Sequence, residues 1–284
     1  MGSDTAGFSV GDRVQVIAAV PCEECWACKA GKQGICINQT SMGYQYGGGF
    51  AEEMIVPEAV LNANGVNKIP GDLSFDEAAV TEPLACALNA QRLIRVGEGD
   101  TVLVMGAGPI GCLHIRLARA LGAKHVMLAD INGDRLALSA NAVKPDRAIN
   151  MSAEDLEAIV LEETGGIGPS VIITAAPAGA AQEQAIGMAA PGGRISFFGG
   201  LPKDKPMISV DSNVVHYKEL ILAGANGSSP AQNAEALELI ASGKVPVADL
   251  ITHRMSLENV RDAIEAVTSG DAIKVVIKPQ GVTS

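Results

Sequence analysis

Four cysteines lie close together near the start of the chain, at a spacing that is typical of a metal site. They follow the pattern C-x2-C-x2-C-x7-C and are Cys22, Cys25, Cys28 and Cys36. Four thiolates can surround one tetrahedral Zn²⁺, and a zinc ion whose ligands all come from the protein is structural. Two lysines of the same loop, Lys29 and Lys32, can offset part of the negative charge. The spacing therefore predicts a structural zinc site.

Two other interpretations of this cluster stay open. Bacterial ferredoxins also begin with C-x2-C-x2-C and bind an iron–sulfur cluster, but their next cysteine follows after three residues and precedes proline. Four unrelated buried thiols are the other alternative, disfavoured because free cysteines rarely crowd into one hydrophilic loop. The remaining cysteines, Cys86 and Cys112, stand alone in apolar helical patterns, so the even count does not imply disulfides.

A glycine-rich turn forms the second group of residues that could do chemistry. The apolar run 102–105 leads straight into Gly106, Ala107, Gly108, Pro109, Ile110 and Gly111. In a strand, turn and helix of this kind, Gly106 permits the tight turn, Gly108 lets the backbone approach a pyrophosphate and Gly111 allows close packing of the helix on the strand. The free N–H groups of the helix N-terminus add positive potential. This pattern predicts a dinucleotide site.

An acidic residue at the end of the next apolar run indicates which dinucleotide is bound. The carboxylate of Asp130 can bind ribose hydroxyls and would repel the extra phosphate of NADP. Residues 131–133 carry no positive charge, whereas Arg135 lies close enough to attract that phosphate or to cover the adenine. The pattern favours NAD. NADP, FAD and glycines that serve packing alone are the alternatives.

These residues need an α/β scaffold to bring them together. Strand patterns occupy 101–105, 125–130, 147–150, 171–175, 194–198 and 219–223, and helices begin near 109, 133 and 153. Alternation of this length predicts a doubly wound parallel sheet with helices on both faces. Two more helices are expected at 231–242 and 257–269; the second is expected to pack an apolar face of Val260, Ile264 and Val267 on the core. Residues before 83 predict short strands at 13–20 and 51–56, with a tight turn at 47–49.

Composition excludes several classes of protein. The formal net charge of −11 argues against binding to nucleic acid. With 284 residues, 48% of them hydrophobic, the chain has enough material for two cores. No apolar run is long enough for a membrane span, and the first residues lack the pattern of a secretory signal. We therefore expect a cytoplasmic protein that acts on a small molecule.

The cysteine cluster, the segment 81–86 (Thr-Glu-Pro-Leu-Ala-Cys) and the glycine-rich turn, in this order, resemble the zinc-dependent medium-chain dehydrogenases. The sorbitol and polyol dehydrogenase branch is the most similar, and the resemblance covers nearly the whole chain. It implies a Rossmann NAD-binding domain over 85–224. It also implies a partial GroES-like β domain, the catalytic domain, formed by 1–84 with 225–284 and lacking its N-terminal part. Dimers or tetramers built across the strand at 219–223 are expected.

The resemblance also assigns roles to individual residues. It makes the four clustered cysteines ligands of a structural zinc ion and the residues from Gly106 to Gly111, with Asp130, the NAD site. It places Glu82 where the family ligates its catalytic zinc or holds the zinc-bound water. An acidic residue at a helix start is also stabilised by the helix dipole, which is the alternative for Glu82. The resemblance further places four residues beside the nicotinamide, namely Phe198, Gly199, Ala225 and Asn226.

The chain departs from the family at the catalytic metal. Family members place a cysteine and a histidine upstream of the segment with which this sequence begins. The four histidines here have no cysteine or carboxylate at ligand spacing, so each is expected to be packed rather than metal-bound; they are His114, His125, His216 and His253. Two hypotheses follow: a dehydrogenase that oxidises a secondary alcohol of a polyol to a ketone by hydride transfer, or a truncated module that binds NAD and structural zinc without turnover. The substrate stays open among polyols, phosphorylated polyols, threonine and simple alcohols.

Overall fold

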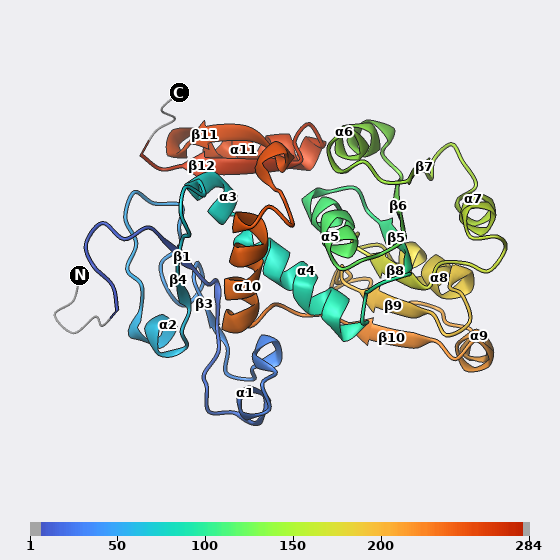
Figure 1. The fold of residues 1–284 in the computed structure, drawn as a ribbon, viewed down its shortest axis with the longest axis horizontal. Coiled ribbons are helices and arrows are strands. Elements are labelled where there is room, and N and C mark those ends of the chain that lie inside the picture. The colour runs from blue at the N-terminus through green and yellow to red at the C-terminus, as the bar shows by residue number, and fades with distance from the viewer. Residues whose placement is uncertain (1–6, 281–284) are drawn as a thin grey trace.

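The computed structural model describes residues 7–280, and its centre is a six-stranded parallel sheet in the order β10-β9-β8-β5-β6-β7 (Figure 1). The strands are β5 (Thr101–Met105), β6 (His125–Asp130), β7 (Arg147–Asn150), β8 (Val171–Thr174), β9 (Arg194–Phe197) and β10 (Ile221–Gly224). Chain order reverses between β5 and β8, which is the doubly wound arrangement. The predicted α/β class is therefore confirmed.

Helices cover both faces of this sheet because successive strand residues point to opposite sides. Val102 and Val104 of β5 belong to one apolar core with α5 (Pro109–Ala120) and α6 (Gly133–Val143). Leu103 and Met105 of the same strand belong to a second core with the other set of helices. The helices of this second set are α7 (Leu156–Glu163), α8 (Gly179–Met188) and α9 (Ser212–Tyr217).

The rest of the described chain forms small sheets and helices beside the large sheet. Three pairs of strands form: β1 (Val14–Val16) with β4 (Val66–Lys68), β2 (Ala19–Val20) with β3 (Thr40–Ser41), and β11 (Ile251–Ser256) with β12 (Lys274–Lys278). The α-helices are α1 (Trp26–Lys29), α2 (Glu58–Asn62), α3 (Phe75–Ala78), α4 (Thr81–Leu93), α10 (Pro230–Ala241) and α11 (Val260–Ser269). Three 3₁₀ turns complete the list, η1 (Gln33–Ile35), η2 (Ala248–Leu250) and η3 (Leu257–Asn259).

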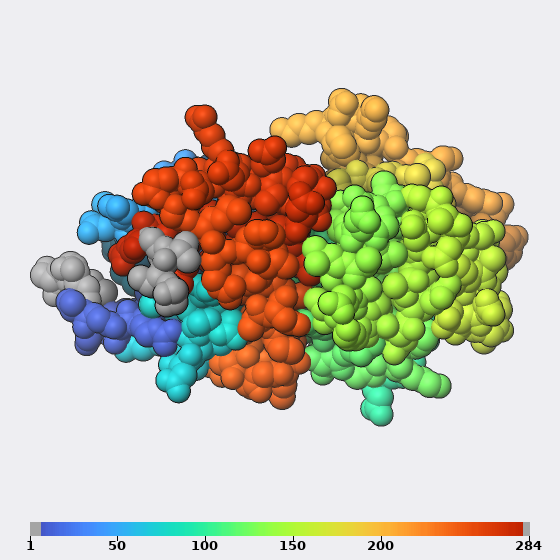
Figure 2. All heavy atoms as spheres, turned by 90° about the horizontal axis from the view of Figure 1, so that it is seen from above, coloured from blue at the N-terminus to red at the C-terminus, as the bar shows by residue number. Residues whose placement is uncertain are grey.

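Residues from the two ends of the sequence lie together. In Figure 2 the described residues near the C-terminus, in orange-red, lie between the blue residues near the N-terminus and the green residues of the first βα units of the sheet. Arg254 of β11 donates from Nε to Asp76 of α3 over 2.5 Å, and Lys278 of β12 lies 3.6 Å from the same carboxylate. Residues 1–6 and 281–284 of the predicted GroES-like part lie outside the described residues. The domain boundaries themselves stay a prediction.

Two sequence-based expectations about these outer parts are wrong. Residues 51–56 form no strand, because no other strand pairs with this segment in the described part of the chain. Ile55 in this segment is 85% exposed. The helix predicted from residue 257 forms, but it buries Ala263 while Ile264 and Val267 are 58% and 43% exposed. Helical spacing identified the helix correctly but not the side that packs. None of the described helices is both long and apolar enough to span a membrane.

A buried arginine connects the sheet to the C-terminal part. Arg116 of α5 is 9% exposed, and both of its terminal nitrogens lie 2.6 Å from the carboxylate of Asp249 in η2. It also donates to the carbonyl oxygens of Pro246 and of Ala142, the latter at 3.1 Å. One guanidinium thus joins α5, α6 and the segment before β11.

Replacement of Arg116 by alanine is expected to lower the free energy of unfolding by about 3 kcal/mol, because two carbonyl groups lose a buried donor. Arg119 of the same helix is the matched control, since its ion pair with Asp146 is exposed on both sides, and Arg119→Ala should cost less than about 1 kcal/mol. Urea denaturation followed by circular dichroism measures both. Equal losses in the two variants would contradict the role given to Arg116.

Candidate functional site

The four predicted cysteine ligands meet around one point. Their Sγ atoms all lie within 4.8 Å of one another, and Cys25, Cys28 and Cys36 are buried. The Sγ of Cys25 lies 3.6 Å from that of Cys28 and 3.9 Å from that of Cys36. Two sulfurs bound to one tetrahedral zinc ion at 2.3 Å are separated by about 3.8 Å. The cluster therefore has the size for a single zinc ion, and not that of a cage for several irons.

Local backbone structure holds the thiols in place. Cys25 is the N-cap of α1, which carries Cys28, and Cys36 ends the 3₁₀ turn η1. The backbone N–H groups of Cys22 and Cys25 donate to the sulfurs of Cys36 and Cys22, at 3.3 and 3.4 Å. The backbone N–H of Cys28 lowers the pKa of Cys25 to about 6, whereas burial raises the pKa of Cys28 to about 12 and also raises that of Cys36. Because a metal binds thiolates rather than thiols, these N–H groups prepare the cluster for a cation.

The glycine-rich turn joins β5 to α5 and can be built only from glycine at two positions. Gly106 has φ +121°, and a Cβ there would lie 3.1 Å from the backbone nitrogen of Ala176. A Cβ on Gly111 would lie 1.8 Å from the carbonyl oxygen of Gly106. A Cβ on Gly108 would meet no protein atom within 4 Å. The fold therefore explains Gly106 and Gly111, whereas the open space at Gly108 is what a ligand approaching the backbone requires.

Pro109 and Ile110 open α5 directly after this turn. Gly108 is the N-cap and has no side chain, so no side-chain cap satisfies the first N–H groups of the helix. Pro109 lacks an N–H and has the φ that a first helical residue needs. The result is a helix N-terminus whose free donors are available to an anion.

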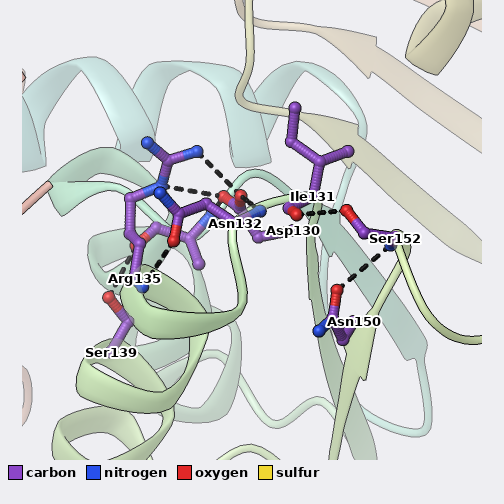
Figure 3. Close-up of polar contacts among 8 residues, drawn as sticks. Asp130, Ile131, Asn132, Arg135, Ser139, Asn150 and Ser152 are labelled. Atoms are coloured by element: carbon purple, nitrogen blue, oxygen red, sulfur yellow. Dashed lines mark hydrogen bonds and ion pairs between the residues drawn. The ribbon is translucent and has the colours of Figure 1, made fainter. Parts of the chain in front are cut away.

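Asp130 lies at the end of β6, beside the turn, and is only 4% exposed (Figure 3). Its Oδ2 accepts from the backbone N–H of Ala107 at 2.7 Å, and its Oδ1 accepts from that of Asn132 at 2.8 Å. Arg135 adds hydrogen bonds from Nη2 to Oδ1 at 2.7 Å and from Nε to Oδ2 at 3.1 Å. Burial acts to raise the pKa of Asp130, but these four donors hold it below its ordinary value. Asp130 is therefore ionised at neutral pH.

Arg135 uses the acceptor positions that a ribose would need. A carboxylate offers about four lone-pair directions, and Arg135 occupies two of them. Its side chain is 32% exposed, whereas that of Asp130 is nearly buried. Arg135 is thus the partner that can move aside when a ribose hydroxyl binds. Sequence analysis predicted both residues but not their pairing.

The expected nicotinamide residues follow the carboxyl ends of two neighbouring strands. Phe198 and Gly199 come after β9, and the backbone N–H of Gly199 donates to the carbonyl oxygen of Thr174 at 2.8 Å. The ring of Phe198 lies edge to face with that of His114, with centroids 4.6 Å apart. Ala225 and Asn226 follow β10, which pairs in parallel with β9. The four residues therefore lie at the same edge of the sheet as the glycine-rich turn.

Glu82 lies in the first turn of α4 and accepts from the thiol of Cys86, with Sγ 3.2 Å from Oε1. Burial raises the pKa of Cys86 to about 12, so this thiol keeps its proton. Pro83, next along the chain, lines a small cavity with Pro109 and Ile110. The structure therefore brings the α4 N-terminus next to the glycine-rich turn.

Lys274 of β12 lines the same cavity and was not identified from the sequence. The cavity holds about 50 Å³ and is otherwise lined by apolar side chains. Burial lowers the pKa of Lys274, while the negative charge of Glu82 opposes that effect. No sequence motif could have selected this lysine, since it lies 163 positions after Gly111 and only the fold brings the two residues together.

The four histidines do not form a metal site with other residues in the described part of the chain. His114 is fully buried, and burial lowers its pKa to about 3, so the ring is neutral. His125 is the first residue of β6 and therefore lies at the amino edge of the sheet, away from the glycine-rich turn. It contacts Asp146 and Glu163 there. The ring of His216 lies edge to face with that of Tyr217, and His253 contacts Thr252. Among residues 7–280, the cysteine cluster is the one group of three or more candidate ligands.

Comparison with known proteins shows the family to which the chain is similar. A family model described as the alcohol dehydrogenase GroES-like domain matches residues 1–65, and one described as zinc-binding dehydrogenase matches 109–242. L-Threonine 3-dehydrogenase of Deinococcus deserti is 32% identical over 278 residues, which cover 98% of this chain and 78% of that protein.

Solved structures of dehydrogenases are also similar to this chain. A zinc-binding dehydrogenase of Sinorhizobium meliloti bound to NADP has a TM-score of 0.89 and 27% identity, over 98% of this chain and 80% of that one. Galactitol-1-phosphate dehydrogenase of Escherichia coli has a TM-score of 0.84 and 28% identity, over 98% and 81%.

The purified protein is expected to contain one zinc ion per chain in the cysteine cluster. Cys28→Ser should lose this zinc, because a hydroxyl is a much weaker zinc ligand than a thiolate. Cys86→Ser is the control, since that thiol lies outside the cluster and keeps its proton. Inductively coupled plasma mass spectrometry after gel filtration measures the metal. Two zinc ions per chain would show a second site that the described residues do not contain.

Proposed function

The chain belongs to the zinc-binding dehydrogenase family, and we propose that it binds NAD at the carboxyl edge of its parallel sheet and oxidises a secondary alcohol to a ketone. The observation that carries this proposal is the turn from Gly106 to Gly111. Its backbone is open to a ligand at Gly108 alone, and a buried, ionised Asp130 lies beside it. A fold without a dinucleotide would have no use for this combination.

Each part of the cofactor has a counterpart in the structure. The pyrophosphate would lie at Gly108 and the N-terminus of α5, near Pro109 and Ile110. The adenosine ribose would bind Asp130 after Arg135 moves. The nicotinamide would lie between the stretches Phe198–Gly199 and Ala225–Asn226, with the neutral ring of His114 behind Phe198.

We favour NAD over NADP because the ionised carboxylate of Asp130 repels a phosphate on the same ribose. Arg135 weakens this repulsion, since its guanidinium pairs with that carboxylate. The Sinorhizobium meliloti protein was solved with NADP, so the preference must be measured for this chain. Fluorescence titrations with NADH and with NADPH under the same conditions give the ratio of the two dissociation constants, which is this preference.

Zinc in the cysteine cluster is structural in this proposal, since four protein ligands leave no position open for a substrate. In the resembled enzymes a second zinc ion acts as a Lewis acid on the alcohol oxygen. Residues 7–280 do not provide three ligands for such an ion around Glu82. Glu82 would contribute a carboxylate near the nicotinamide, with the Cys86 thiol orienting it by a hydrogen bond.

For the substrate we propose a polyol or a related small molecule with a secondary alcohol. L-Threonine and galactitol 1-phosphate, named for two similar enzymes, share that group although they differ in charge. We expect a cytoplasmic homo-oligomer in which the edge strands β10 of two subunits pair. Two apolar residues of this strand, Ile221 and Leu222, are 52% and 37% exposed and would be covered by such pairing.

A second candidate function is a module that binds NAD and structural zinc without turnover. The observation that favours it is the missing second ligand cluster among the described residues. Reduction of NAD at 340 nm in the presence of sorbitol, xylitol, galactitol, galactitol 1-phosphate or L-threonine separates the two functions. Chelator-sensitive turnover would support the dehydrogenase, whereas NADH binding with no turnover on any of them would favour the module.

Gly108→Ala is expected to weaken NADH binding at least about tenfold and to leave the thermal midpoint unchanged. The added methyl group meets no protein atom but projects into the space that the pyrophosphate would use. Gly47→Ala, at an equally open glycine outside the site, should bind NADH like the wild type. Fluorescence titration with NADH measures both. Wild-type affinity in Gly108→Ala would place the cofactor elsewhere.

Lys274→Gln is expected to weaken NADH binding about fivefold to tenfold, because it removes a partly buried cation beside Pro109 and Ile110. The effect should grow at low salt, since it is electrostatic. Lys278→Gln, at the other end of β12, is the control and should leave the affinity unchanged. Isothermal titration at two salt concentrations provides the measurement. Equal affinities of wild type and Lys274→Gln would remove Lys274 from the cofactor site.

A further inference from the structure

The cysteine lobe, residues 22–36, contacts the segment that leaves the large sheet. This crossover segment, residues 225–229, runs from β10 to α10. Asn226 donates from Nδ2 to the carbonyl oxygen of Gly34 at 3.0 Å. Gly34 belongs to η1 and lies two residues before the ligand Cys36. The loop that carries the predicted zinc ligands thus lies directly against the backbone expected beside the nicotinamide.

The approach at Gly34 is too close for any side chain. A Cβ at this position would lie 2.8 Å from the carbonyl oxygen of Asn226 and 3.6 Å from the backbone nitrogen of Ser228. The backbone of Gly34 is not in the left-handed region, so its conformation does not require glycine. Packing against the crossover segment is therefore what requires a glycine at this position.

Helix α4 holds the crossover segment from another direction. Asn89 donates from Nδ2 to the carbonyl oxygens of Gly227 and Asn226, at 3.0 and 3.3 Å. Its own Oδ1 accepts from Nε2 of Gln232 in the first turn of α10, at 3.0 Å. The segment is thus fixed between a stable helix of the core and the cysteine lobe.

The cysteine lobe has backbone hydrogen bonds of its own but a very small apolar core. Its apolar cluster consists of the cysteines and Ala27, and Trp26 is 61% exposed. The four Sγ atoms come from both ends of the lobe and lie within 4.8 Å of one another, so one bound cation would join those ends. The position of Gly34 therefore depends on the ion that the cysteines bind.

We infer that the metal-loaded cysteine lobe positions the crossover segment for the nicotinamide, with Gly34 and Asn89 as positioning residues that do not touch the cofactor. This inference rests on the proposed function, because it takes residues 225 and 226 to flank the nicotinamide. It assigns the structural zinc a role in binding one end of the cofactor. The adenosine end, at Asp130, has no contact with the lobe and should not depend on it.

The test compares NADH with ADP-ribose, which has the same adenosine and pyrophosphate but no nicotinamide. Gly34→Ala should weaken NADH binding about tenfold and leave ADP-ribose binding unchanged. Asn89→Asp should act in the same direction, because aspartate still accepts from Gln232 but cannot donate to the two carbonyl groups. Gly47→Ala is the matched control and should bind both ligands like the wild type. Isothermal titration gives all the affinities, and zinc content is measured on each variant.

Removal of zinc from the wild type by a chelator provides a second test. It should weaken NADH binding and leave ADP-ribose binding unchanged. Hydrogen exchange should then increase in residues 225–229 but not in β5 and β6. Equal weakening of both ligands in Gly34→Ala, or no weakening of either, would overturn the inference. Failure of the wild type to bind NADH at all would instead overturn the proposed function.

Discussion

The contact between Gly111 and the carbonyl oxygen of Gly106 determines where the rest of the site can lie. It lets α5 begin directly against the end of β5, so the helix N-terminus points at the carboxyl edge of the sheet. Every other residue of the cofactor site is placed relative to that edge. Asp130 ends the strand on one side of β5, and the backbone of Ala176 packs against Gly106 on the other. A single methyl group at Gly111 would separate the helix from the strand.

Much of the sheet could be predicted because its strands are buried on both faces and read as continuous apolar runs. The predicted bounds of β5, β6 and β7 agree with the observed ones, and the glycine-rich turn and Asp130 follow from local rules. The cysteine cluster could be predicted for a similar reason, since its four candidate ligands lie in one short loop. In these regions the chemistry depends on residues that are close in sequence.

Features that depend on distant residues could not be predicted. The pairing of Arg135 with Asp130 needs side-chain conformations, and the position of Lys274 needs the return of the chain to the α5 N-terminus. Residues 51–56 end in three apolar residues but have no strand partner in the described chain, and the exposed side of α11 depends on which sheet lies beneath it. Comparison with known proteins bore out the family resemblance, whose evidence was the order of three local motifs.

The contact between Gly34 and Asn226 also has a consequence for how the chain folds. These residues are 192 positions apart, so the contact closes one of the longest loops in the molecule. Contacts of such high sequence separation form late, because the entropy of closing the loop is lost before the contact stabilises anything. On the ribosome the cysteine lobe is made before the large sheet, whereas its partner segment is made after the last strand of that sheet. A lobe that can take up zinc by itself would therefore wait, already folded, for the rest of the protein to reach it.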